Sequence, residues 1–229
     1  MTLKSQLSRE NHELAVFCAA IIAANVLAML QVHGPLQMSF SLSAVPILIV
    51  SLALGWETGS MVGIYGGVLQ AINYGSPLYI LYSMIMGGVS GFFAKNHGLT
   101  KRWGSTLFAV GVFFMFIWMT TVGLSYMTPE IIAILMALTV FCAIEYTMLK
   151  KHLAHNPLLN MTLAACAGVA ACIPYDIAIL TFSQGYEFFA SLAVVAKDLT
   201  QDYLAAIIAA VLLQHKTLRK ALELPSRVR

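Results

Sequence analysis

The sequence predicts an all-α protein, a polytopic bundle of about eight membrane-spanning helices that forms a single domain over residues 1–229. Of the 229 residues, 59% are hydrophobic and 10% are charged, which is more apolar and less charged than a soluble domain. The apolar residues also form runs close to the roughly 20 residues that cross a hydrocarbon core. These runs are continuous rather than alternating, so they favour helices over the strands of a membrane barrel.

Eight apolar segments follow one another along the chain, at residues 14–30, 41–54, 59–71, 77–94, 105–126, 131–149, 158–182 and 188–213. The second and third are short, and only the four residues Gly55, Trp56, Glu57 and Thr58 separate them. Two short or tilted helices in a tight hairpin and a partly re-entrant pair both agree with this spacing. The number of spans therefore depends on this pair.

Basic residues are confined to alternate loops. Every Lys and Arg except Lys197 falls in the N-terminal tail (1–13), near residues 95–102, at residues 150–151 or in the C-terminal tail (214–229). The loops around residues 33, 73, 128 and 184 contain neither. Because Lys and Arg collect in cytoplasmic loops, the pattern predicts a multi-pass protein of the plasma membrane with both termini in the cytoplasm.

Several functional classes lack a signal in this sequence. The cysteines Cys18, Cys142, Cys166 and Cys172 lie in apolar segments without a CxxC pair, so neither a disulfide framework nor a zinc site is expected. No glycine-rich phosphate loop, HExxH motif or nucleophile and base pair stands out. The net charge of +3 reports orientation rather than nucleic-acid binding. We therefore expect a protein that is not an enzyme and that binds no cofactor, metal or nucleic acid.

Alanine recurs at every fourth position along two neighbouring ridges of the first segment: Ala15, Ala19 and Ala23, and beside them Ala20, Ala24 and Ala28. Small residues at this spacing let a second helix approach closely, where dispersion contacts hold helices together in lipid. The second helix can belong to this chain or to a membrane partner, and the pattern alone leaves both open.

The first ridge, Ala15, Ala19 and Ala23, resembles the coupling motif in the substrate-binding S components of energy-coupling factor (ECF) vitamin transporters. The stretch VPILIVSLALG at residues 45–55 and the glycines Gly59, Gly63, Gly66 and Gly67 are similar to their second and third helices. Tyr175-Asp176 and the stretch SLAVVAKDL at residues 191–199 resemble their fifth and sixth helices. The resemblance covers roughly the first 95 and the last 70 residues. Since S components have six helices, it implies an S-component-like core of six with an additional helix pair at 104–150.

What the resemblance implies is a role in vitamin uptake. An S component captures a vitamin or a similar small molecule near the outer face and itself hydrolyses nothing. It works with a coupling membrane subunit, which would contact Ala15, Ala19 and Ala23 here, and with two ATPase subunits. The small-molecule substrate, these subunits and the lipid bilayer are the partners implied. A solitary S-type protein that works without ATPase partners is the other form of this interpretation.

Polar residues within apolar segments are the candidates for substrate binding, because ionisable groups are costly inside a membrane. They are Tyr175, Asp176, Lys197, Asp198, Gln201 and Asp202, with Asn73 and Tyr74 from an outer loop. Positions 197 and 201, like 198 and 202, lie one helical turn apart. We expect Lys197 to contact an anionic group of a polar or zwitterionic molecule with a ring. A structural ion pair from Lys197 to Asp176 or Asp202 is the alternative. Tyr79 and Tyr82, taken singly, are typical of an interfacial aromatic belt.

Two functions from other classes stay open. Lys197 in the last segment could form a Schiff base, as in a retinal-type photoreceptor, which retinal addition and hydroxylamine bleaching would reveal. A non-transporting membrane scaffold of S-component-like architecture would bind no small solute and would keep its partners when Lys197 and Asp176 are neutralised.

Overall fold

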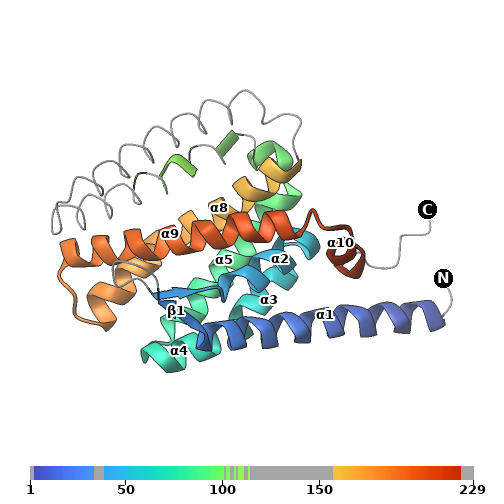
Figure 1. Ribbon diagram of the computed structural model, residues 1–229, viewed down its shortest axis with the longest axis horizontal. Helices are drawn as coiled ribbons and strands as arrows, with labels where there is room; N and C mark the ends of the chain where they lie inside the picture. Colours follow the sequence, from blue (N-terminus) through green and yellow to red (C-terminus); the bar gives the residue numbers. More distant parts are fainter. Residues whose placement is uncertain are drawn as a thin grey trace.

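The computed structural model describes residues 3–33, 39–100, 102–103, 106, 108–110, 113 and 157–222, which form a helical bundle with one short hairpin (Figure 1). The elements are α1 (Leu3–Met29), β1 (Gln31–His33), β2 (Ser39–Ser41), α2 (Ala44–Leu54), α3 (Trp56–Gly66), α4 (Val68–Tyr74), α5 (Leu78–Lys95), α8 (Pro157–Ala178), a π-helical turn (Ile179–Ser183), α9 (Phe188–Leu212) and α10 (Lys216–Leu222). The strands are antiparallel, with Val32 opposite Phe40. The expected helix pair at 104–150 lies outside the described residues apart from isolated positions.

Three helical stretches of the described part are long and apolar enough to cross a membrane: Asn11–Met29, Leu78–Lys95 and Leu158–Ser183. They support the prediction of a helical membrane protein, while the count of eight spans and the orientation of the termini stay predictions. The second and third expected segments are short, as predicted: α2 and α3 have 11 residues each, and α3 ends before Gly67, after which α4 begins. α9 has 25 residues, but Lys197, Asp198 and Asp202 interrupt its apolar sequence.

α8 packs against both α5 and α9 and is part of the most buried of the three membrane-length stretches. Of its most apolar stretch 72% is buried, against 17% for α1 at the edge of the bundle. Its small side chains permit this position, since Cys166, Val169 and Cys172 are all fully buried. The carboxyl-terminal part of α8 thereby comes to lie inside the bundle, where it can carry a functional side chain.

Glycines bring α3 and α5 into backbone contact. A Cβ atom at Gly63 would fall on the backbone carbonyl of Ser83, and one at Gly87 would fall on the carbonyl of Gly59. A glycine also brings α5 and α8 close together, because a Cβ atom at Gly168 would meet the hydroxyl of Ser90. Close backbone approach of this kind is how helices adhere in lipid, and it fixes α5 between α3 and α8.

The break between α3 and α4 is stabilised by Asn25 of α1. Its amide nitrogen donates to the carbonyl of Tyr65 at 3.2 Å, and its side-chain oxygen accepts from the backbone nitrogen of Leu69 at 3.4 Å. These bonds occupy backbone groups next to Gly67, where α3 ends. α4 begins directly after Gly67, and its Gln70 lines the interior cavity.

The two alanine ridges of α1 face in different directions. Ala20, Ala24 and Ala28 are buried, and the first two pack with Ile47 and Val50 of α2 and Val62 of α3. Ala15 and Ala19 are exposed, and Ala23 is partly exposed. The second ridge thus serves internal packing, and the first ridge lies on the outer surface of the bundle.

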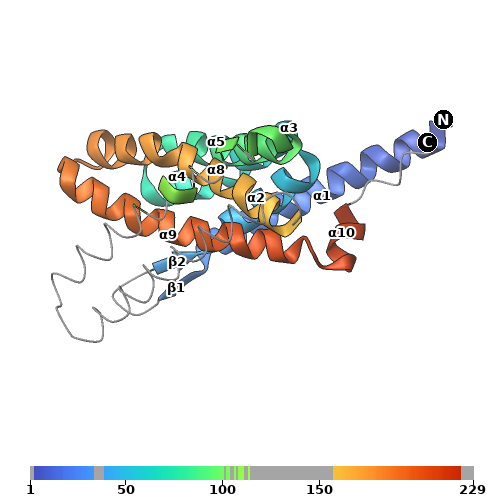
Figure 2. The same cartoon turned by 90° about the horizontal axis from the view of Figure 1, so that it is seen from above.

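α10 and the N-terminal end of α1 lie at the same end of the molecule, as Figures 1 and 2 both show. The hairpin, α4 and the turn between α8 and α9 lie towards the other end. The predicted tails are partly helical, because α1 begins at Leu3 and α10 covers Lys216–Leu222. The loops without basic residues near positions 33, 73 and 184 therefore share one end of the bundle.

Candidate functional site

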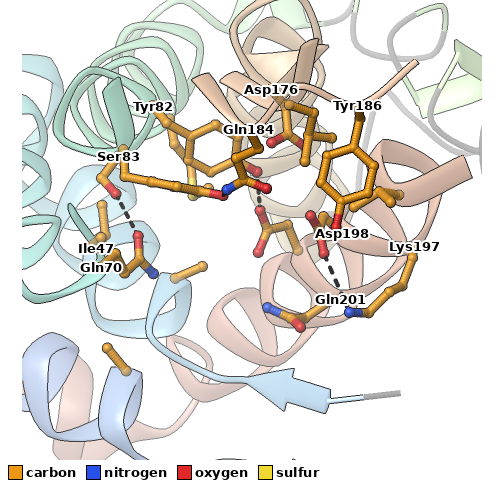
Figure 3. A pocket seen from close by; sticks show the side chains of 17 residues that line it. Ile47, Gln70, Tyr82, Ser83, Asp176, Gln184, Tyr186, Lys197, Asp198 and Gln201 are labelled. Atoms are coloured by element: carbon orange, nitrogen blue, oxygen red, sulfur yellow. Dashed lines mark hydrogen bonds and ion pairs between the residues drawn. The ribbon is translucent and has the colours of Figure 1, made fainter. Parts of the chain in front are cut away.

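A cavity of about 380 Å³ lies within the bundle at the level where α9 carries its charged residues. Figure 3 shows its lining from close by. The polar residues that line it are Gln70 of α4; Tyr79, Tyr82 and Ser83 of α5; Asp176 of α8; Gln184 and Tyr186 of the following turn and loop; and Lys197, Asp198, Gln201 and Asp202 of α9. Ala28, Ala44, Ile47, Met86, Leu180 and Val194 complete it. Its volume is within the range of about 300–1,000 Å³ that is usual for small-molecule sites.

α9 supplies the charged wall of the cavity, because residues four apart share one face of a helix. Asp198 and Asp202 follow each other by one turn, as do Lys197 and Gln201. The Lys197 Nζ atom lies 3.9 Å from Asp198 Oδ1, and both side chains are about one-third exposed (29% and 32%). This exposed pair is weak, since water still solvates both partners.

Asp202 lies deeper and is 5% exposed. The hydroxyl of Tyr82 on α5 donates a hydrogen bond to its Oδ2 atom. Tyr82 itself is buried, and its backbone carbonyl accepts from the Cys172 thiol of α8 at 3.3 Å. This corrects the sequence-based assignment of Tyr82 to an interfacial belt. The physical reason is that the interior of the bundle holds a carboxylate that needs a donor.

Asp176 comes from α8, two residues after the internal Pro174 and just before the π-helical turn. Helical irregularities of this kind are frequent at functional sites. The side chain is 3% exposed and lines the cavity (Figure 3). Within the described part of the chain it makes no hydrogen bond and no ion pair. Among those residues Asp176 is therefore a carboxylate that faces the cavity without a protein partner.

The neutral wall is a chain of hydrogen bonds between α2, α4 and α5. Gln70 donates from Nε2 to the Ser43 hydroxyl at 2.5 Å and accepts from the Ser83 hydroxyl at 3.1 Å. At the other side, Gln184 donates to the Tyr79 hydroxyl at 3.2 Å. These amides and hydroxyls are oriented by their partners, as polar groups in a preformed binding site are.

The structure brings together five of the eight residues predicted for substrate binding: Asp176, Lys197, Asp198, Gln201 and Asp202. Tyr175 does not line the cavity and is 41% exposed, and Asn73 is exposed at the end of α4. The side chain of Tyr74 lies outside the described residues. The alternative considered for Lys197, an ion pair with Asp176 or Asp202, is not formed in the described part, where Lys197 pairs with its neighbour Asp198.

Sequence reasoning did not assign Tyr82 and Ser83 to the site. For Ser83 the signal was available, because it lies on the same face of α5 as Tyr79 and one turn further along. For Tyr82 no local signal exists, since its partner Asp202 is 120 residues away in the sequence.

No protein-family model, no curated protein and no solved structure matches this chain. The functional interpretation therefore depends on the chemistry of the cavity and on the pattern of the sequence.

Proposed function

We propose that this protein is a membrane-embedded substrate-binding subunit for the uptake of a vitamin or a similar small polar molecule. It would act as an S component of the ECF type, with energy supplied by partner ATPase subunits. The observation that carries this proposal is the cavity of about 380 Å³ inside a bundle of apolar helices. Its size suits a molecule of vitamin dimensions. Charged and amide groups inside a membrane protein are costly to maintain and usually mark a pathway or a binding site.

The arrangement of helices supports the same proposal. α1, α2, α3, α5, α8 and α9 pack together in the described part, and residues from all of these except α3 line the cavity. On the outside of α1, the ridge of Ala15, Ala19 and Ala23 leaves a face on which a helix of the coupling subunit can pack closely. The cavity and this ridge are separate features, as capture of a substrate and coupling to a partner require.

A non-transporting scaffold is the second candidate, and one observation favours it. Lys197 is already paired with Asp198, so part of the polar cluster is satisfied without a ligand. The two candidates differ in what the purified protein carries. A substrate-binding subunit retains or takes up a small solute, whereas a scaffold carries only its protein partners.

Native mass spectrometry of the detergent-purified protein tests the proposal, combined with thermal-shift screening against a library of small metabolites. Val194→Trp should abolish the bound mass or the stabilisation, because Val194 lines the cavity and an indole would fill much of it. Leu204→Trp is the matched control, since Leu204 lies on the same helix but is exposed and does not line the cavity.

Two results would contradict the proposal. If the library contains no stabilising solute and no small molecule co-purifies, while a protein partner does, the chain is a scaffold. If Val194→Trp and Leu204→Trp retain the same solute equally well, the solute binds somewhere other than this cavity.

A further inference from the structure

The cavity is unbalanced in charge. Among its described lining residues, the three carboxylates of Asp176, Asp198 and Asp202 face one ammonium group, that of Lys197. This ammonium group lies beside Asp198, at 3.9 Å, on the more exposed side of the cavity. The two most buried carboxylates, Asp176 and Asp202, thus have no cation of the described part as a partner. A ligand that brings a further negative charge would increase this imbalance.

Asp176 indicates which kind of ligand group this excess of negative charge favours. An ionised carboxylate accepts hydrogen bonds and donates none, so Asp176 can be satisfied only by a donor, and best by a positively charged one. Asp202 has the Tyr82 hydroxyl as a donor, but Asp176 makes no such bond within the described residues although it is 97% buried. A negative charge at this position is stabilised by a neighbouring positive charge, which a cationic ligand group would supply.

A metal ion is a poor candidate for this missing cation. No three His, Cys, Asp or Glu side chains in the described part lie close enough together to hold one. The cavity is also far larger than a bare ion requires. Its remaining groups suit an organic molecule: Gln70, Gln184 and Gln201 offer amides. Tyr79, Tyr82 and Tyr186 offer aromatic rings that attract cations and stack on other rings.

We propose that the cavity binds an organic cation, with its amine or other positively charged nitrogen next to Asp176 and Asp202. The body of this molecule would lie against the tyrosines and amides. This inference rests on the proposed function, because it names the substrate class of the same site. It also changes the role expected for Lys197, which positions Asp198 rather than receiving an anionic group of the substrate.

The test is a thermal-shift and equilibrium-binding screen of the full-length protein with small metabolites sorted into cations, neutral molecules, zwitterions and anions. Na⁺ and Mg²⁺ are included as inorganic probes. Each cationic hit is repeated with its isosteric alcohol, in which a hydroxyl replaces the charged nitrogen. We expect hits among the cations and loss of binding with the alcohols.

The variants Asp176→Asn and Asp202→Asn keep the shape of the cavity and remove one charge each. Each should weaken binding of a cationic hit by roughly 30-fold to 1,000-fold, the usual effect of truncating one partner of a buried charge pair. Glu187→Gln is the matched control, because Glu187 is an exposed acid at the start of α9 that does not line the cavity. The empty Asp176→Asn variant should unfold at a temperature no lower than the unmodified protein, because the substitution removes an unpaired charge and breaks no bond.

The outcomes separate this inference from the proposed function. Hits that are only anions, zwitterions or neutral molecules would overturn the cation inference and leave a substrate-binding protein. Stabilisation by Na⁺ or Mg²⁺ alone would assign the carboxylates to an inorganic ion and also overturn it. Binding of a cation that is unaffected in both Asn variants would place the molecule outside this site. A screen without any hit would overturn both the inference and the proposed function.

Discussion

The two alanine ridges of α1 permit a sharp prediction, because equal substitutions on one helix should have opposite consequences. Ala24 is fully buried, and its Cβ atom is only 3.0 Å from the position that a Cβ atom at Gly66 would occupy. A leucine there adds three carbon atoms to a filled space between α1 and α3. Overpacking of this kind costs about 1–3 kcal/mol. Ala19 is exposed, so Ala19→Leu should change the free energy of unfolding by no more than about 0.5 kcal/mol.

The difference in stability between the two variants is measured by thermal unfolding of the detergent-solubilised protein, with size-exclusion chromatography as the readout. We expect a lower unfolding temperature for Ala24→Leu and no change for Ala19→Leu. Under the proposed function, substrate uptake in cells that contain the proposed ATPase partners measures the effect on coupling. Ala19→Leu should abolish uptake without weakening substrate affinity, because the bulky side chain keeps the partner helix away.

Cys18→Leu is the control for uptake, since Cys18 is a small exposed residue beside the ridge but not on it. Its uptake should resemble that of the unmodified protein. If Ala19→Leu is the less stable of the two alanine variants, the assignment of the faces of α1 is wrong. If Ala19→Leu and Cys18→Leu transport equally well, the exposed ridge is not the coupling surface.

Three further predictions concern packing and topology. Gly63→Ala should lower the free energy of unfolding by about 1–3 kcal/mol, because its Cβ would fall on a carbonyl of α5. Gly98→Ala is the control and should be tolerated, because its Cβ meets open space. Equal unfolding temperatures for the two variants would contradict the close contact of α3 and α5. Asn25→Ala should cost about 1–3 kcal/mol in the same assay by leaving backbone groups at the break between α3 and α4 unsatisfied, and an unchanged stability would show that water replaces its bonds. A cysteine in place of the exposed Asn73 should react with an impermeant reagent in intact cells. A cysteine in place of the exposed Lys220 should react only after the cells are permeabilised. The reverse result would refute the prediction that both termini are cytoplasmic.

The charged half of the candidate site was predictable from the sequence, because α9 is one continuous helix. Helical spacing alone places Asp198 and Asp202 on one face, and the low tolerance of membranes for charge makes them candidates for a functional role. Asp176 was accessible by the same reasoning. The cavity itself was not predictable, since it depends on how α5 and α8 lie against α9.

Residues near the expected outer loops show the limit of this reasoning. Asn73, Tyr175 and Ser76 are all polar and close to the predicted outer face, yet Asn73 and Tyr175 are exposed and Ser76 is 1% exposed. Sequence position gives the depth of a residue in the membrane but not the direction of its side chain. That direction depends on where each helix begins and on its rotation against its neighbours.

The sequence by itself determined that this is a helical membrane protein, where most of its apolar segments lie, and that the last two of these segments carry the acidic residues that line the cavity. These properties follow from hydropathy and helical spacing, which act between residues close together in the chain. Only the tertiary structure decided which alanine ridge packs inside, that Tyr82 donates to Asp202, and that Asp176 is left without a partner in the described part. Those outcomes join residues up to 120 positions apart. They depend on how the helices pack against one another, which the local pattern of the sequence does not determine.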